Sequence, residues 1–176
     1  KLMYDHIGLR VGNLDASVRF YTAALAPLGF VLCSRDDSGA GFGPKGAPAL
    51  WLHLHKGSAG SAAHVAFRAK DHAAIKQFHA VREAVGDAIE ITFDVHTRLD
   101  LPDVIWLCRE IESTRPFFIE DPLRCENPNS FKTLRPRVHV PIAAGEQFSS
   151  KWEFRELIEE EWIDYARIDL CIAGGI

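Results

Sequence analysis

The sequence of 176 residues lacks the features that mark several large classes of protein. No apolar run approaches the roughly 18 residues that a membrane-spanning helix needs, and no signal-peptide pattern precedes the first expected strand. Lysine and arginine total 20 against 24 acidic residues, and the net charge of −4 offers no basic surface for nucleic acid. We therefore expect a cytoplasmic protein that binds neither nucleic acid nor a membrane.

Cysteine is scarce, and its spacing excludes two further classes. The four cysteines are far apart, without the paired spacing of a zinc site or of a disulfide framework, so we expect reduced thiols. Lysine stands at position 1 in place of methionine, and we expect the sequence to be a fragment. The hydrophobic fraction of 47% and the charged fraction of 25% are those of an ordinary globular protein.

The second half of the chain has a periodic pattern in which a short apolar run is followed by an acidic residue. The runs cover 89–93, 117–119, 138–142 and 165–168, and they precede Asp94, Glu120, Glu146 and Asp169. The intervals between these acids are 26, 26 and 23 residues, about the length of a strand, a turn, a helix and a return loop. We predict four successive βα units with a parallel sheet.

This pattern places the four acids at one edge of the predicted sheet, because parallel strands end on the same side. That edge is where parallel α/β proteins carry their sites. Three carboxylates that converge without a basic partner repel one another, which favours a cation between them, and oxygen ligands suit a hard ion such as Mg²⁺. The alternative is that the acids cap helices or are solvated loop charges.

Four motifs in this half resemble the barrel of the enolase superfamily, and its mandelate racemase and acid-sugar dehydratase branch in particular. They are residues 93–96, 118–123, 140–146 and 169–176, and the resemblance covers residues 81–176. It implies that Asp94, Glu120 and Glu146 bind Mg²⁺. The ion would stabilise an enediolate, formed when a proton is removed next to the carboxylate of a sugar-acid-like substrate.

The same resemblance assigns roles to two more residues and leaves others unfilled. His96 matches a position that serves as an acid in some dehydratases, and Asp169 matches the acid that orients a catalytic histidine on the next strand. The resemblance begins near the third barrel strand and stops just past the sixth, without the usual base-bearing strands. We therefore expect a half-barrel that is catalytically incomplete, retains metal binding, and forms a homodimer that covers its open sheet edges.

The first half has the pattern of a βαβββ module. A strand over 4–11 is followed by a helix that Asn13 or Asp15 can cap, and short runs at 30–34, 40–43 and 49–55 predict three more strands. The opening pattern then returns, since residues 63–68 repeat 5–10 at an interval of 58 residues.

Paired βαβββ modules resemble the vicinal oxygen chelate fold of glyoxalases and bleomycin-resistance proteins. The resemblance rests on residues 4–7, 20–21 and 64–67, and it implies that His6 and His64 hold a divalent metal. The glutamate that usually completes that site has no counterpart here, and metal sites usually have three or more protein ligands. The alternative is that both histidines are hydrogen-bonded structural residues.

The two halves meet without a proline- or serine-rich linker. A helix that begins near Asp71 keeps its apolar spacing through Val81 to Val85. We therefore predict a mixed α/β fold with a glyoxalase-like module at 1–80 fused through this helix to an enolase-like partial barrel at 81–176. Three functions stay open: a Mg²⁺-dependent dehydratase or racemase site in the second half, a metal or small-molecule site in the first half, and a non-catalytic chimeric scaffold.

Overall fold

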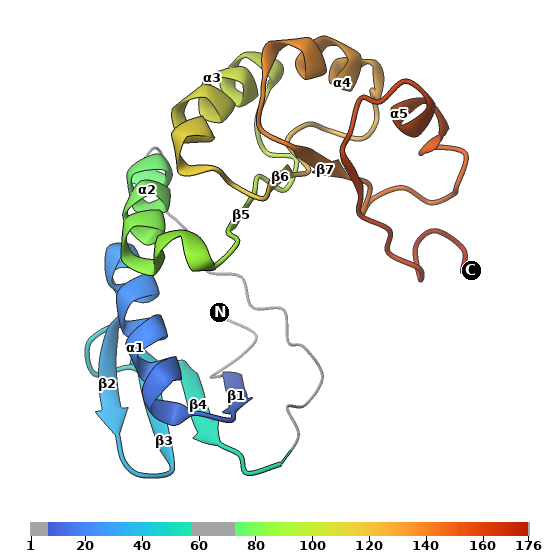
Figure 1. The fold of residues 1–176 in the computed structure, drawn as a ribbon. Helices are drawn as coiled ribbons and strands as arrows, with labels where there is room; N and C mark the ends of the chain where they lie inside the picture. The colour runs from blue at the N-terminus through green and yellow to red at the C-terminus, as the bar shows by residue number, and fades with distance from the viewer. Residues whose placement is uncertain (1–6, 58–72, 176) are drawn as a thin grey trace. The chain divides into compact units, whose positions relative to one another are not determined.

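The computed structural model describes residues 7–57 and 73–175. The chain divides into two compact units, residues 1–88 and 89–176, and each unit has a four-stranded sheet (Figure 1). The predicted mixed α/β fold with a parallel four-stranded sheet in the second half is confirmed. His6 and His64 lie outside the described residues.

In the first unit the described elements follow the predicted βαβββ order. Strand β1 (Ile7–Val11) leads into α1 (Leu14–Leu25), and β2 (Val31–Arg35), β3 (Gly39–Gly43) and β4 (Leu50–Leu54) follow. The sheet order is β1-β4-β3-β2, in which β1 is parallel to β4 and the other neighbours are antiparallel.

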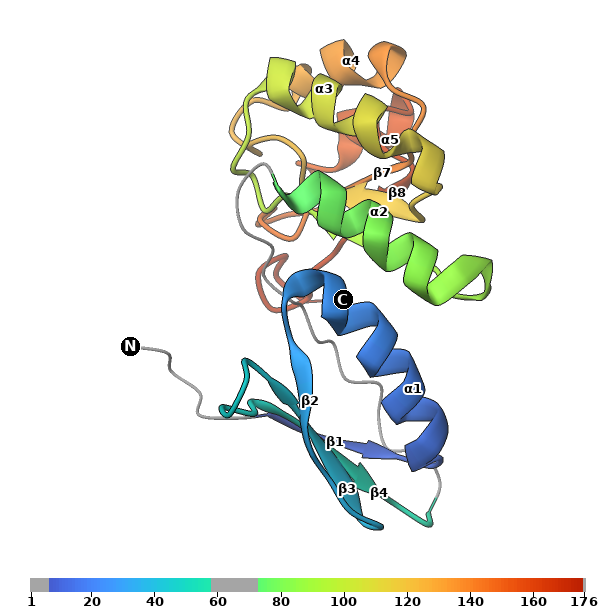
Figure 2. The ribbon, with the colours of Figure 1, turned by 90° about the vertical axis from the view of Figure 1, so that its left-hand side faces the viewer.

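Helix α1 covers the sheet of the first unit, as Figure 2 shows. Of the two predicted caps, Asn13 caps the helix, because its Oδ1 accepts a hydrogen bond from the Ala16 backbone N–H at 2.9 Å. The helix passes into a 3₁₀ turn, and Gly29 then adopts a φ of 81°, a conformation that favours glycine. The apolar face of α1 packs into one core with the sheet, which comprises Leu14, Val18, Leu25, Ala40, Phe42, Leu50 and Leu52.

Helix α2 (Ala73–Val85) packs against α1 and therefore belongs to the first unit. The compact units meet between Ala88 and Ile89, whereas the boundary expected from the sequence, at residue 80, divides this helix. Within residues 7–57 and 73–175 the short 3₁₀ helices are Ala26–Leu28, Gly86–Ala88, Glu112–Thr114 and Arg135–Arg137.

The second unit is a parallel sheet with its helices on one side (Figure 1). Its strands, in sheet order, are β5 (Thr92–Asp94), β6 (Phe118–Glu120), β7 (Ile142–Ala144) and β8 (Tyr165–Ala166). Helices α3 (Leu101–Ile111), α4 (Asn129–Leu134) and α5 (Arg155–Glu159) each follow one of the first three strands. The order is the predicted succession of βα units.

The strands are shorter than the apolar runs that predicted them. Val138 and Val140 are buried, yet they precede β7, which begins at Ile142. Ile168 lies in the run that predicted β8 but is exposed and outside the strand. An apolar run therefore marks the buried chain near a strand, and the hydrogen-bonded ladder occupies only part of it.

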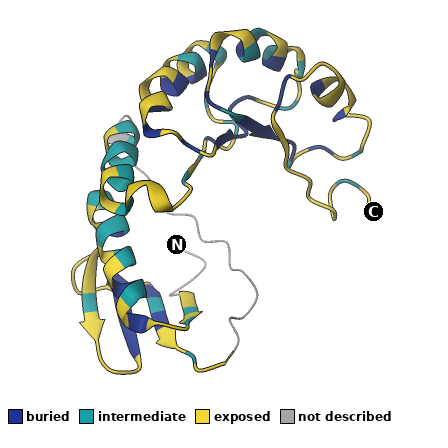
Figure 3. Ribbon diagram, viewed as in Figure 1, coloured by how far each residue is buried: buried dark blue, intermediate teal, exposed yellow. Residues whose placement is uncertain are grey.

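Buried residues of the second unit concentrate on β6, β7 and the sheet-facing sides of the helices (Figure 3). Phe154 and Leu157 of this region are buried, whereas 54% of the surface of Ile158 is exposed. The four cysteines are free thiols, as predicted. None of the described helices is long and apolar enough to pass through a bilayer.

Substitution of Ile119, which is completely buried in β6, tests this core. We expect Ile119→Ala to lower the free energy of unfolding by about 2–5 kcal/mol, because the neighbouring strands β5 and β7 cannot close the cavity. Urea denaturation followed by circular dichroism measures the loss. The control is Ile158→Ala, which should cost about 0.5 kcal/mol or less; equal losses from both variants would contradict this description of the core.

Candidate metal centre

The candidate site lies at the carboxyl edge of the parallel sheet. Asp94 is the last residue of β5 and pairs in register with Glu120, the last residue of β6. Glu146 follows two residues after the end of β7, and Asp121 directly follows β6. The predicted convergence of these strand ends is therefore present, and it includes one acidic residue that the period of the sequence did not indicate.

Three carboxylates form the centre of this edge. Glu120, Asp121 and Glu146 each offer an oxygen atom, and these atoms lie within 4.8 Å of one another. Only 6% of Glu120 and 4% of Asp121 is exposed, while Glu146 is half-buried. Oxygens that share one hard cation lie within roughly 4–5 Å of each other, because each is about 2.0–2.6 Å from the ion. The cluster has the donor type and the spacing that such a cation requires.

Asp121 is the most deeply buried acid of the cluster. Its Oδ1 accepts a hydrogen bond from the Gly145 backbone N–H at 3.1 Å, and its buried Oδ2 has no hydrogen-bond partner in the described part of the chain. Burial raises the pKa of Asp121 to about 6, and repulsion from Glu146, Glu120 and Asp94 acts in the same direction. The environment therefore disfavours its negative charge as long as no cation offsets it.

Glu120 has a basic partner, so this carboxylate does not meet the others without a compensating charge. The Arg167 Nε donates to Glu120 Oε1 at 2.6 Å, and the guanidinium lies 5.8 Å from the centre of the Phe118 ring. This hydrogen bond raises the pKa of Arg167 above its usual value. The backbone N–H of Arg167 donates to the Ala144 carbonyl at 2.9 Å, which holds the arginine beside β7. One positive charge thus offsets part of the negative charge of the cluster.

His96 lies between the two outer acids. Its Nδ1 is 3.1 Å from Glu146 Oε1 and 3.9 Å from Asp94 Oδ2. The backbone N–H of His96 also donates to Asp94 Oδ1 at 2.8 Å, and the residue has a positive φ of 53°. Asp94 therefore lies at the predicted edge, but it is not one of the three acids whose oxygens lie within 4.8 Å of one another.

Asp169 forms its hydrogen bonds with the turn that follows it and not with the residues of this cluster. Its Oδ1 accepts from the backbone N–H groups of Cys171 and Ile172 at 2.8 and 3.2 Å, which is the bonding of a capped turn. This arrangement agrees with the alternative that the acids cap local structure. A role for Asp169 in orienting a catalytic group stays a prediction.

Sequence reasoning missed Asp121 for a physical reason. Successive side chains of a strand point to opposite faces, so a residue adjacent to the ligand Glu120 is expected to point away from it. Asp121 instead has a positive φ of 40°, which breaks the alternation and allows both side chains to reach the same cluster. The signal in the sequence was the pair of adjacent acids directly after a buried strand.

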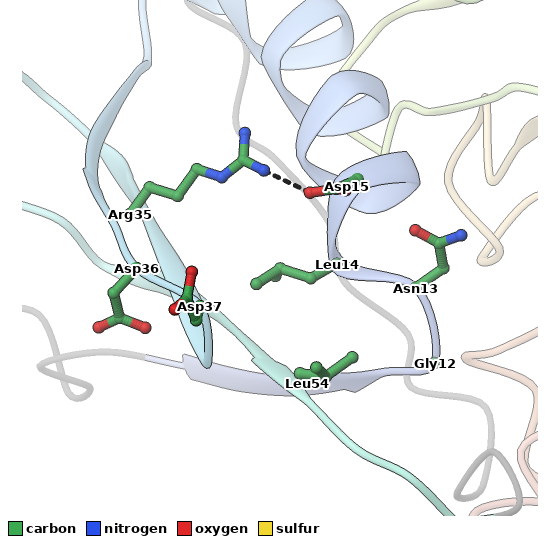
Figure 4. Close-up of a pocket in the computed structure, with 8 residues that line it drawn as sticks. All are labelled: Gly12, Asn13, Leu14, Asp15, Arg35, Asp36, Asp37 and Leu54. Atoms are coloured by element: carbon green, nitrogen blue, oxygen red, sulfur yellow. Dashed lines mark hydrogen bonds and ion pairs between the residues drawn. The ribbon is translucent and has the colours of Figure 1, made fainter.

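The first unit contains an open hollow beside the start of α1 (Figure 4). Arg35 and Asp15 form an ion pair across it. The Asp36 carboxylate accepts hydrogen bonds from Ser38 and Gly39, and the hydrogen bonds from Ser38 lower its pKa. Because these charged groups already bond within the chain, we assign no ligand to the hollow.

Comparison with known proteins identifies relatives of this chain. The family model described as "Enolase C-terminal domain-like" matches residues 51–176. A D-mannonate dehydratase of Caulobacter sp. (strain K31) is 42% identical over 101 residues, which are 57% of this chain and 25% of that protein. The chain thus spans about a quarter of the length of the curated relatives that it matches.

Solved structures show the same relationship. An enolase from Pantoea ananatis with bound D-gluconate and Mg is similar with a TM-score of 0.55 and 34% identity, over 57% of this chain and 24% of that one. L-Talarate dehydratase from Polaromonas sp. JS666, complexed with Mg and L-glucarate, has a TM-score of 0.55 and 32% identity, over 58% and 29% of the two chains.

Gly145 offers a test of how the cluster is positioned. Its φ is 126°, and a Cβ added there would lie 2.1 Å from Phe154 Cε1. We expect Gly145→Ala to displace the segment between β7 and Glu146 and to lower the melting temperature, because an L side chain is strained at this φ and also clashes. Gly46→Ala is the control: it has a positive φ of 79° but no neighbour within 4 Å, so its loss should be smaller. An equal loss would show that strain alone, without the clash, sets the effect.

Proposed function

This chain belongs to the enolase C-terminal domain-like family, and from that membership and the acidic cluster we infer that its second unit binds Mg²⁺ together with a sugar acid. The relatives that support this are an acid-sugar dehydratase at 42% identity and structures in which Mg accompanies gluconate or glucarate. The observation that carries the proposal is the convergence of buried carboxylates at the edge where parallel α/β folds carry their sites.

We propose that Asp94, Glu120 and Glu146 hold the cation. All three offer oxygen atoms, the ligand type that Mg²⁺ prefers, and they follow three adjacent parallel strands. When bound, the cation supplies positive charge that stabilises negative charge developing on a substrate carboxylate. Two observations support the proposal: Oδ2 of Asp121 is buried without a partner among the described residues, and oxygens of Glu120, Asp121 and Glu146 lie within 4.8 Å of one another.

His96 is the candidate proton donor. Its Nδ1 faces Glu146 Oε1 at 3.1 Å, and this contact fixes the ring at the edge of the cluster. The side chain is half exposed, so that a substrate bound at the edge can reach it. Asp169 is proposed as an orienting residue for a catalytic group outside the described residues.

We assign no proton-abstracting base among the described residues. The proposal for this chain is therefore binding of the cation and of a sugar acid, and we propose that dehydration needs a base from barrel strands that the resemblance does not include. A purely non-catalytic scaffold is the limiting case of this proposal, in which saturating Mg²⁺ gives no turnover of any sugar acid. We also propose that two copies of the chain associate through the open edges of the sheet.

Calorimetric titration with Mg²⁺ tests the proposed centre. We expect the intact chain to bind Mg²⁺ and Glu120→Gln to bind it at least about tenfold more weakly, because the substitution removes a buried anionic ligand. Glu126→Gln is the matched control, since Glu126 is exposed and its Oε1 lies 3.8 Å from Arg124 Nη1. Equal heats from the intact chain and Glu120→Gln would end the proposal.

The first unit supports a second candidate. Its described elements have the βαβββ order of a glyoxalase-like module, and we propose that residues 1–80 are such a module, fused to the enolase-like part. The family match, however, includes residues 51–80 as well. In this proposal His6 and His64 bind a divalent metal or help to bind a small molecule.

Titration with Ni²⁺ separates this candidate from the first. Because imidazole is a good ligand for Ni²⁺, binding by the first unit should disappear in His64→Ala and persist in Glu120→Gln. His79→Ala is a control on a histidine of α2 outside the proposed pair. Unaltered Ni²⁺ binding by His64→Ala would reject the histidine site.

A further inference from the structure

The buried carboxylate of Asp121 is not explained by the contacts within the chain. Only 4% of the residue is exposed, and one of its two oxygens, Oδ1, is bonded to the Gly145 N–H. The other oxygen, Oδ2, is buried and has no partner in the described part of the chain. A buried charged oxygen without a partner is strongly unfavourable, and such atoms are rare in folded proteins.

The basic group of the cluster does not account for this oxygen. The guanidinium of Arg167 bonds to Glu120 Oε1, and the contacts of His96 are with Asp94 and Glu146. What surrounds Asp121 instead is negative charge, since an oxygen of Asp121 lies within 4.8 Å of one from Glu120 and one from Glu146. A cation at this position satisfies the oxygen and offsets the repulsion together.

We propose that Asp121 is a fourth acidic residue of the cation site and that its Oδ2 faces the bound ion. This inference rests on the proposed Mg²⁺ centre and adds a residue that the period of the strands does not supply. The position is built by the fold: Asp121 has a positive φ directly after β6, an oxygen of its carboxylate lies within 4.8 Å of one from Glu120, and the backbone N–H of Gly145, directly after β7, binds Oδ1. With Oδ1 fixed, the second oxygen is left for the ion.

The proposal has two consequences of opposite sign. Without a cation, the charge of Asp121 repels the neighbouring carboxylates and weakens the fold. With a cation, the same charge strengthens binding. A residue with a purely structural role behaves differently, because its removal weakens the fold and leaves the affinity of the folded protein for the ion unchanged.

The experiment is Asp121→Asn, which keeps the size of the side chain and an oxygen that can accept from Gly145 N–H. Asparagine also tolerates a positive φ. We expect the melting temperature in EDTA to rise, and calorimetry with Mg²⁺ to show affinity at least about tenfold weaker than that of the intact chain. Asp103→Asn, an exposed aspartate in the first turn of α3, is the matched control and should leave Mg²⁺ affinity unchanged.

The outcomes separate the inference from the proposal on which it rests. If the intact chain binds no Mg²⁺, the proposed centre fails. If the intact chain binds Mg²⁺ and the affinity of Asp121→Asn is within twofold of it, only the role of Asp121 fails. That role also fails if Asp121→Asn has both a lower melting temperature in EDTA and a weaker affinity for Mg²⁺ than the intact chain. Asp121→Gly serves as a second variant, since glycine adopts the same φ without a carboxylate, and it should show the same loss of Mg²⁺ affinity.

Discussion

Repulsion among carboxylates is the constraint on which the second unit depends. The parallel direction of its strands brings Asp94, Glu120 and Glu146 to one edge, and the turn after β6 adds Asp121. Polar groups at this edge include the Arg167 guanidinium, the His96 ring and the backbone N–H groups of Gly145 and His96, and each is directed at an acid of the group. The polar contacts of the edge are thus arranged around an excess of negative charge, which is the setting in which a hard cation binds.

The sequence predicted the edge because the edge follows from strand direction alone. Acids spaced by one βα unit must end on the same side of a parallel sheet, and the in-register pair of Asp94 with Glu120 shows it. The remaining geometry depends on information that a period does not contain. Asp121 joins the cluster through a single backbone angle, and Arg167 reaches Glu120 across 47 residues of sequence because β8 lies beside β7.

The position of the boundary between the two units is also something that the sequence pattern predicted only in part. The family match begins at residue 51, inside β4, while the compact units divide between Ala88 and Ile89. Packing decides the boundary between the compact units. Helix α2 contacts α1 and so belongs to the first unit, although the family match includes its residues. Apolar spacing predicted the helix correctly, but spacing along one helix does not say which neighbour that helix packs on.

The bond between Glu120 and Arg167 links two parts of the sheet that are not neighbours. Glu120 ends β6 and Arg167 directly follows β8, with β7 between them. Because β8 has only two residues, its backbone ladder is short, and fraying at that end withdraws the guanidinium from a carboxylate that stays buried. Opening of the last strand and loss of charge balance at the acidic edge are therefore one cooperative event, so amide exchange along β8 reports on the state of an edge two strands away.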